Sequence, residues 1–387
     1  MSCFEHAKPL LSRANAGISI PAGDWTLDIG GVVNAYYIGA QNKGSTPING
    51  GLANVRDANG SKAQSINTGL LPNFLTVSGK TRQNDLDVTF LISMSPSSSG
   101  NGANGTVANE NRQAFLTFGD ASWGTIKAGK DLGIFGSDAI LSDMTLLGVG
   151  SQGAVGSTGG TTTTLGRIGT GYQYASWKGQ FSYLSPNFNG FSFNAGVMHP
   201  GQNAPAVGQT SPVLEGKVSY EIAGDVSGKI WLGGISQKVN GTTTAADYTA
   251  NNLEVGAKVA SAGVELVGYY SDGKGAGTTF FLSNGATAAG NKRDSNGGYV
   301  QATYKLPGVG TKVGASWGES NLKLANGETV ASNPNLVKKN EMWTVGVYHP
   351  LTKHLNLVTE FSEVQATQQE GSKNKSAIGS VGAILFF

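Results

Sequence analysis

The segment Asp85-Leu-Asp-Val-Thr-Phe-Leu-Ile-Ser-Met94 alternates apolar and polar side chains along its length. Successive side chains of a β-strand point to opposite faces, so this period of two predicts a strand with one apolar and one polar face. A tilted strand of about ten residues can cross a bilayer, whereas strands of soluble proteins have about 5–6 residues. The apolar face carries Leu86, Val88, Phe90, Ile92 and Met94, and the polar face carries Asp85, Asp87, Thr89 and Ser93.

Outward from this segment, the same alternation recurs along the chain and predicts about sixteen strands. The connections alternate between short and long, as in bacterial outer-membrane barrels with short periplasmic turns and longer extracellular loops. The predicted strands are 24–39, 68–80, 84–95, 110–119, 122–130, 168–185, 190–199, 212–223, 227–237, 249–261, 263–272, 295–306, 310–318, 338–349, 353–363 and 374–387.

The composition excludes several other classes of protein. Glycine makes up 58 of 387 residues, charged residues 13%, and the net charge is +2. A disordered chain would carry more net charge, a helical membrane protein needs runs of about 20 apolar residues, and a nucleic-acid-binding protein would cluster its basic residues. The single cysteine, Cys3, can form neither an internal disulfide nor a cysteine-based zinc site. We therefore expect no nucleic-acid partner, no metal and no other cofactor.

The strands predict an all-β fold: a closed, antiparallel transmembrane β-barrel of about 16 strands over residues 24–387. An open sheet edge in lipid would leave backbone N–H and C=O groups unpaired, and closure removes the edges. A barrel of this size is too wide for side chains to fill, so its polar faces line a water-filled channel. Residues 1–23 contain Ala14-Asn15-Ala16, which has the small-x-small form of a cleavage site, and we interpret this N-terminal segment as the remnant of a signal peptide.

Four motifs stand in order along these strands. They are Asn111-Arg-Gln-Ala-Phe-Leu-Thr-Phe-Gly-Asp-Ala-Ser-Trp-Gly-Thr-Ile-Lys-Ala-Gly-Lys-Asp131, Tyr183-Leu-Ser-Pro-Asn-Phe-Asn-Gly-Phe-Ser-Phe193, Tyr348-His-Pro-Leu-Thr-Lys-His-Leu355 and the final strand ending in Phe387. Over about residues 24–387, the chain that carries them resembles the general porins of Gram-negative bacteria. The motifs are similar, in this order, to the hairpin before the family's third loop, the turn after the sixth strand, the seventh periplasmic turn and the C-terminal assembly signal.

The resemblance implies a homotrimer in the outer membrane, in contact with outer-membrane lipid and lipopolysaccharide. It also implies insertion by the barrel-assembly machinery, with Phe387 as the assembly signal. Loop three, predicted at residues 131–167, would fold into the lumen. The first half of this loop is too apolar for a solvated surface loop, which also favours packing inside the barrel. The implied function is passive diffusion of ions and small hydrophilic solutes, with weak charge selectivity.

General porins place acidic residues on loop three opposite basic residues on the barrel wall, and this implies a set of constriction residues. Opposite charges across a narrow pore create a transverse field that orients dipolar solutes and sets ion preference. The candidates are Asp138 and Asp143 on the loop, with Lys130, Arg167 and Lys217 on the wall. By strand parity, further lumen-facing residues are Asp85, Asp87, Glu215, Glu254 and Lys258.

Two alternative functions remain open from the sequence: a substrate-specific outer-membrane channel and an outer-membrane barrel enzyme. An enzyme would need a Ser/His or Asp/His pair near the outer rim, where His199 is the candidate. Gly148-Val-Gly-Ser-Gln-Gly153 fits the pattern GxGxxG, but the Gly/Thr-rich residues after it cannot form the helix that a dinucleotide site needs. We expect a channel rather than an enzyme.

Overall fold

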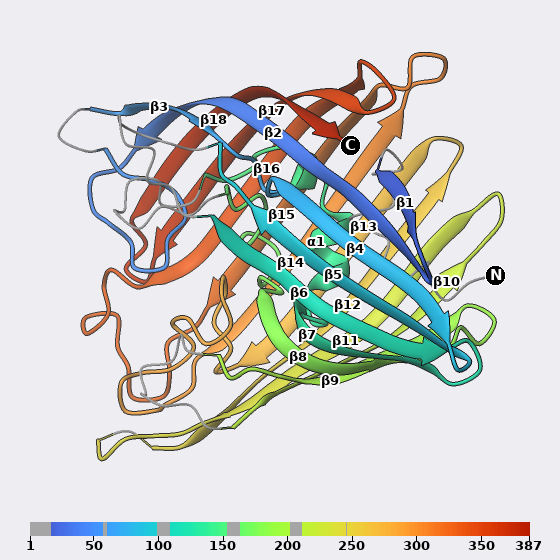
Figure 1. The fold of residues 1–387 in the computed structure, drawn as a ribbon. Coiled ribbons are helices and arrows are strands. Elements are labelled where there is room, and N and C mark those ends of the chain that lie inside the picture. The colour runs from blue at the N-terminus through green and yellow to red at the C-terminus, as the bar shows by residue number, and fades with distance from the viewer. Residues whose placement is uncertain (1–16, 57–59, 99–108, 153–162, 202–210, 245) are drawn as a thin grey trace.

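The computed structural model of the protein describes residues 17–56, 60–98, 109–152, 163–201, 211–244 and 246–387. An 18-stranded antiparallel sheet curves into a barrel, which closes where β18 pairs with residues 32–43 of β2 (Figure 1). The strands are β1 (Ile18–Ala22), β2 (Trp25–Lys43), β3 (Lys62–Asn67), β4 (Phe74–Gln83), β5 (Leu86–Ser95), β6 (Glu110–Asp120), β7 (Gly124–Leu132), β8 (Trp177–Leu184), β9 (Phe191–Met198), β10 (Val213–Ile222), β11 (Ser227–Val239), β12 (Tyr248–Ser261), β13 (Val264–Lys274), β14 (Asp294–Lys305), β15 (Lys312–Leu322), β16 (Val337–Pro350), β17 (Leu355–Gln368) and β18 (Lys373–Phe386).

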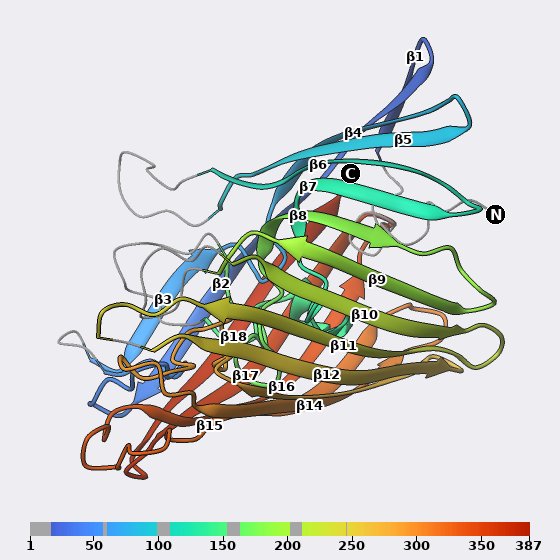
Figure 2. The ribbon, with the colours of Figure 1, turned by 90° about the horizontal axis from the view of Figure 1, so that it is seen from below.

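These strands occupy sixteen positions around the barrel, which confirms the predicted fold class. β3 and β4 share one position, because residues 36–41 of β2 pair with β3 and residues 26–32 pair with β4. β1 and β18 also lie end to end along β2. In Figure 2, strands β9 to β12 run side by side in chain order, as their pairing requires.

The alternation of faces follows the sequence pattern. On β5, Ile92 is 55% exposed and points outward, while the next residue, Ser93, is buried on the inner side. Leu253 and Glu254 on β12 repeat this contrast. An apolar outer face and a polar inner face are what a barrel needs between lipid and a water-filled lumen. Among the described residues, no helix is long and apolar enough to cross a membrane.

The predicted domain boundary at residue 24 is too late. β1 pairs with residues 25–29 of β2 in a hairpin, so the sheet begins at Ile18. Gly23 sits in the turn with φ of 62°, a left-handed conformation that favours glycine. The rest of the predicted N-terminal segment, residues 1–16, lies outside the described residues.

The predicted strand at 68–80 is wrong in its first part, because the chain turns away from the ladder between β3 and β4. The cause is the side chain of Asn34 on β2, which takes the place of a paired strand. Its Oδ1 accepts a hydrogen bond from Gly69 N at 2.8 Å, and its Nδ2 donates to Leu71 O at 2.8 Å. Leu70 and Leu71 are thereby buried inside the barrel.

The predicted strand at 168–185 is also wrong in its first half, and loop three is correspondingly longer than predicted. Only residues 177–184 form β8. Ile168 and Tyr172 do alternate with small residues, but Gly169 has φ of 75°, which a strand cannot contain. Both apolar side chains are buried against the inner wall of the barrel.

Candidate channel constriction

Loop three connects β7 to β8, and its described parts are residues 133–152 and 163–176. It contains the short helix α1 (Ser137–Ser142) and the 3-10 helix η2 (Met144–Leu147), and Figure 1 shows α1 within the ring of strands. Glu215 on β10 holds the start of the loop: its Oε2 accepts hydrogen bonds from Ile134 N at 2.6 Å and Phe135 N at 3.0 Å.

Two more inward carboxylates hold the loop by its backbone. Glu254 on β12 accepts a hydrogen bond from Gly136 N at 3.0 Å. Glu360 on β17 accepts from Val149 N at 2.7 Å and Gly150 N at 2.8 Å. A loop inside a barrel leaves its own backbone N–H groups without ladder partners, and carboxylates form strong, charge-assisted hydrogen bonds to them. Glu215 and Glu254 therefore face the interior, where they bind the loop rather than the solute.

The apolar side chains of loop three pack against three separate parts of the inner wall. Phe135 is buried with Ile235 and Val239 of β11, and Ala139 and Ile140 lie in a cluster with aromatic wall residues. The Tyr299 hydroxyl on β14 donates a hydrogen bond to Ala139 O at 2.8 Å. The loop is thus fixed along one side of the lumen, and the open passage lies between it and the opposite wall.

Asp138 of α1 forms the polar contact between the loop and this passage. Its carboxylate pairs with Lys217 Nζ on β10 at 2.5 Å and with Lys229 Nζ on β11 at 2.8 Å. Burial raises the pKa of the Asp138 carboxyl, but the positive charges of Lys217 and Lys229 more than offset this and lower the pKa to about 2. Lys229 also lies 3.8 Å from Glu221, so the two lysines meet two carboxylates on this side of the passage.

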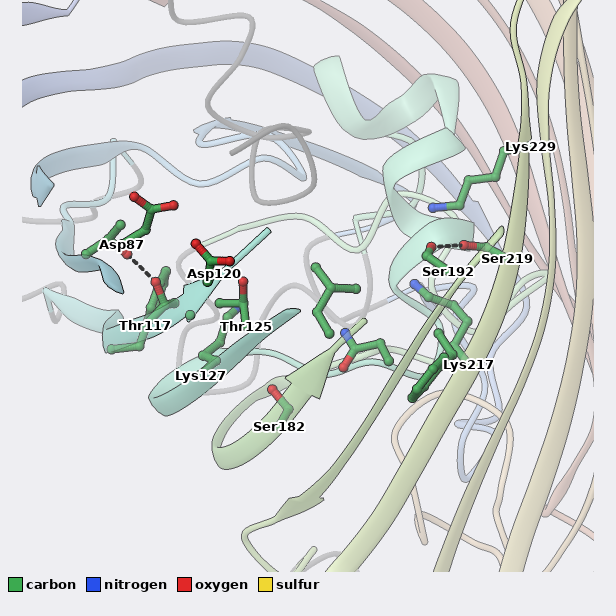
Figure 3. A pocket seen from close by; sticks show the side chains of 16 residues that line it. Asp87, Thr117, Asp120, Thr125, Lys127, Ser182, Ser192, Lys217, Ser219 and Lys229 are labelled. Atoms are coloured by element: carbon green, nitrogen blue, oxygen red, sulfur yellow. Dashed lines mark hydrogen bonds between the residues drawn. The ribbon is translucent and has the colours of Figure 1, made fainter. Parts of the chain in front are cut away.

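A cavity follows the passage on the side of the short turns, and we call it the periplasmic cavity (Figure 3). Across it from Lys217 and Lys229, Figure 3 shows Asp87 of β5 and Asp120 of β6. Arg82 of β4 lies between these two aspartates, with Nη1 at 3.0 Å from Asp87 and Nη2 at 2.9 Å from Asp120. The charged and hydroxyl-bearing lining residues are Asp87, Thr89, Thr117, Asp120, Thr125, Lys127, Ser182, Ser192, Lys217, Ser219 and Lys229.

Two of the predicted constriction residues are buried inside loop three and do not line the passage. Asp143 caps η2, accepting from Thr145 N at 2.9 Å and from the Tyr172 hydroxyl at 2.8 Å. Arg167 is 0% exposed, and its guanidinium group donates to Met342 O at 3.0 Å. The prediction was wrong for both, because Asp143 completes the hydrogen bonding within the loop and Arg167 binds the loop to β16, so neither side chain meets water.

Two other predictions fail on strand geometry. Lys130 is on the opposite face of β7 from Lys127, and its Nζ donates to Asn111 O at 2.8 Å. Asp85 is not on a strand at all: Asn84 and Asp85, with φ of 49° and 62°, form the tight turn between β4 and β5. Asp85 is therefore an exposed turn residue and not a lumen residue.

Two lysines of the periplasmic cavity were missed by the sequence analysis, although parity could have found them. Lys127 stands between Ile126 and Ala128 on β7, lines the cavity and pairs with Asp131. Lys229 is followed on β11 by Ile230, which is 48% exposed on the outer face. In both strands the lysine alternates with apolar neighbours, the same signal that identified the polar face of β5.

The remaining predicted residues lie near the periplasmic end of the barrel. Lys258 shares the inner face of β12 with Glu254 and pairs with Glu265 of β13 at 2.8 Å. Phe387 follows β18, and its backbone exchanges hydrogen bonds with Gly31 at 2.7 and 3.0 Å. Within the described part of the chain, no group of three or more His, Cys, Asp or Glu residues could hold a metal ion.

Comparison with known proteins agrees with this architecture. A family model described as Gram-negative porin matches residues 11–369. Among solved structures, the outer-membrane channel DcaP of Acinetobacter baumannii is similar at a TM-score of 0.68 and 14% identity, over 95% of this chain and 99% of that one. An anion-selective porin from Comamonas acidovorans has a TM-score of 0.65 and 17% identity, over 94% of this chain and 100% of that one. Salmonella typhi OmpF in complex with daunomycin has a TM-score of 0.60 and 16% identity, over 96% of this chain and 100% of that one.

A search of curated proteins gave no significant match. The family model nevertheless spans nearly the whole chain, and the closed barrel agrees with it. The barrel is therefore a channel of the outer membrane for passive diffusion. The chain belongs to the family of Gram-negative porins.

Proposed function

We propose that this porin is a general diffusion channel for ions and small hydrophilic solutes, with only weak charge selectivity. The observation that carries the proposal is the balance of charge around the passage. Lys217 and Lys229 with Asp138 and Glu221 sum to 2 − 2 = 0, and Arg82 with Asp87 and Asp120 sums to 1 − 2 = −1. The total along the channel axis is only −1, so neither sign of ion is strongly favoured.

Across the channel the charges are separated, because Lys217 and Lys229 lie on the opposite side of the periplasmic cavity from Asp87 and Asp120. Lysines that face aspartates set up a transverse field, which aligns dipolar solutes as they pass. The low-dielectric wall of the barrel concentrates that field in the water-filled gap. Weak net selectivity and a strong transverse field are therefore compatible in one constriction.

Planar-bilayer recording with a salt gradient tests the proposal. The purified protein should produce large, ohmic conductance steps and a reversal potential close to zero. A reversal potential near the ideal value for a single ion would contradict the charge balance described above. The absence of conductance steps from a correctly folded preparation would contradict the assignment as a diffusion channel.

We also infer that the protein assembles as a homotrimer, in lipid and lipopolysaccharide, after insertion by the barrel-assembly machinery through the segment ending in Phe387. Support comes from the family and from a trimeric form of Vibrio cholerae OmpT, a similar structure with a TM-score of 0.56 and 16% identity. Unheated electrophoresis in detergent should give a trimer band that collapses to the monomer on boiling. A Phe387→Ala variant should reach the outer membrane in smaller amounts, and equal amounts would contradict the role of Phe387.

We propose no enzymatic activity for the barrel. Several inner acidic residues have structural partners: Glu215 and Glu360 bind the loop backbone, Asp138 pairs with lysines, and Asp87 and Asp120 pair with Arg82. His199, the candidate for a rim site, follows β9 and donates its backbone N–H to Gly179 O at 2.8 Å. These contacts support a role in shaping the channel.

A further inference from the structure

A second cavity lies inside the barrel at the other end of β6, β7 and β8, on the side of the long loops, and we call it the outer cavity. Its lining comes from the start of β6, the end of β7, the return of loop three and the loop after β13. Six of its large apolar or aromatic side chains are only partly buried. They are Leu132, Leu141, Leu146, Tyr174, Trp177 and Phe280.

This grouping is unusual for the lumen of a porin, which is a polar, water-filled space. Burial against the wall accounts for Ile134 and Phe135 of loop three. Leu141 and Leu146 also pack against the wall clusters, but both are only partly buried and line the outer cavity. A concave, mostly apolar surface that stays accessible to water is the usual form of a small-molecule site.

Three aromatic rings give the outer cavity its shape. Tyr174 and Phe280 meet edge to face with ring centroids 6.1 Å apart, and Trp177 meets Phe74 in the same way at 6.1 Å. These contacts fix the rings of Tyr174, Trp177 and Phe280, which all line the cavity. Ring faces at fixed positions suit a flat or branched apolar group.

One ion pair lines this otherwise apolar cavity. Arg112 lies over the Trp177 ring at 5.9 Å and pairs with Glu110 at 2.8 Å. The side chain of Arg112 is 9% exposed and that of Glu110 is 40% exposed, so the guanidinium group is on the apolar side and the carboxylate is on the water side. A guanidinium group presents a planar fork of donors that matches a carboxylate, and a solute carboxylate can compete with Glu110 for it.

The path beyond the outer cavity carries charges of both signs. The periplasmic cavity lies at the opposite ends of the same strands, and Lys127, Lys217 and Lys229 line it. A solute that leaves the outer cavity toward the periplasm passes these three lysines and also Asp87 and Asp120. The preference for an anion therefore comes from Arg112 in the outer cavity.

We propose that the outer cavity is a binding site for small carboxylates with an apolar, aromatic or branched body. The apolar body lies against the rings and the leucines, and the carboxylate binds Arg112. The site rests on the proposed diffusion function, since the solute must reach it through an open channel. It makes the channel selective for this class of solute without strong selectivity for simple ions.

Current recording through single channels tests the site with three probes of matched size or charge. The first is 3-phenylpropanoate, which has both features. Acetate keeps the charge without the ring, and 3-phenylpropan-1-ol keeps the ring without the charge. With each probe on the long-loop side, 3-phenylpropanoate should interrupt the ionic current briefly and repeatedly. The other two probes at the same concentration should not.

Two variants locate the interruptions in the outer cavity. Phe280→Ser should shorten each interruption by about tenfold, the effect of losing one apolar contact of about 1.4 kcal/mol. Arg112→Gln should weaken the binding of 3-phenylpropanoate, and the effect of the alcohol on the current should stay unchanged. Phe188→Ser is the matched control, because Phe188 is 55% exposed in the turn after β8 and outside the cavity.

Unmodified conductance and heat-modifiable migration check that each variant is folded. Equal interruption by acetate would overturn the site, since the lysines alone would then explain binding. Equal interruption by the alcohol would overturn the role of Arg112. Normal conductance without any interruption by 3-phenylpropanoate would overturn the site and leave the diffusion function standing, whereas absent conductance would contradict the diffusion function itself.

Discussion

Asp138 on loop three and Lys217 on β10 form an ion pair with 2.5 Å between Oδ2 and Nζ. They are distant in sequence, and the pair joins the loop to the wall at the narrow part of the lumen. Lys229 reaches the other oxygen of the same carboxylate at 2.8 Å. The group therefore both positions the loop and sets the charge on one side of the passage.

Removing the carboxylate should shift the channel toward anions. In Asp138→Asn, the charges of Lys217 and Lys229 are no longer compensated, and the permeability ratio of chloride to potassium should rise roughly two- to threefold. Reversal potentials in a salt gradient measure this ratio. Asp247→Asn is the matched control, because Asp247 lies in the loop before β12 and forms an exposed ion pair with Lys238 at the end of β11. If Asp138→Asn and Asp247→Asn had the same reversal potential, the role of Asp138 in selectivity would be contradicted.

Removing one of the lysines should have the opposite effect. Lys217→Gln leaves only Lys229 beside Asp138 and Glu221, so this side of the passage becomes negative and the preference moves toward cations. Lys217→Arg keeps the charge and should behave as the unmodified protein does. Lys130→Gln serves as a control of equal charge change on the other face of β7. If Lys130→Gln shifted the reversal potential as much as Lys217→Gln, the placement of the constriction would be wrong.

The sequence predicts the barrel well because the alternation of faces is local. Ile92 and Ser93 show it within two adjacent residues, and the same reading extends around the barrel. It fails where a side chain replaces a strand, as Asn34 does beside residues 68–73. No local pattern indicates that replacement, since the two segments meet only in the folded barrel.

The constriction is predicted in part for the same reason. Parity and position in loop three predict Asp138 and Lys217 at the constriction, and the two side chains form an ion pair inside the barrel. Their role in the constriction stays a prediction, and parity could also have identified Lys127. Asp143 and Arg167 are placed wrongly because their burial depends on contacts such as that of Arg167 with Met342, 175 residues away. Whether a charged loop residue faces water or completes the fold is decided by such distant partners.

The pH dependence of selectivity should reflect the low pKa of Asp138. Its pKa of about 2 lies below the usual value of 3.8, because Lys217 and Lys229 stabilise the charged form despite burial. The carboxylate therefore stays ionised at every pH above about 3, and the stabilisation that its charge provides is lost only as the pH falls toward 2. The difference in reversal potential between the unmodified channel and Asp138→Asn should stay constant from pH 7 to pH 4. A difference that disappears near pH 5 would show an ordinary or raised pKa.

Glu360 should control the steadiness of the open channel. Its Oε2 accepts two backbone hydrogen bonds from loop three, from Val149 and Gly150. In Glu360→Ala both donors lose a buried partner, at a cost of about 1–3 kcal/mol each. This end of the loop should then move into and out of the passage, so we expect a lower melting temperature and frequent partial closures in single-channel records.

Glu363→Gln separates this loop contact from a general effect of removing a carboxylate from β17. Glu363 is on the outer face of the same strand and pairs with Lys375 at 3.0 Å. A half-exposed pair of this kind contributes about 0–1 kcal/mol, so its loss should leave both the melting temperature and the closures nearly unchanged. If the carboxylate of Glu360 holds loop three to the wall, channels of Glu360→Ala should close often while channels of Glu363→Gln stay open. Equal behaviour of the two variants would mean that the apolar contacts of the loop are sufficient to hold it.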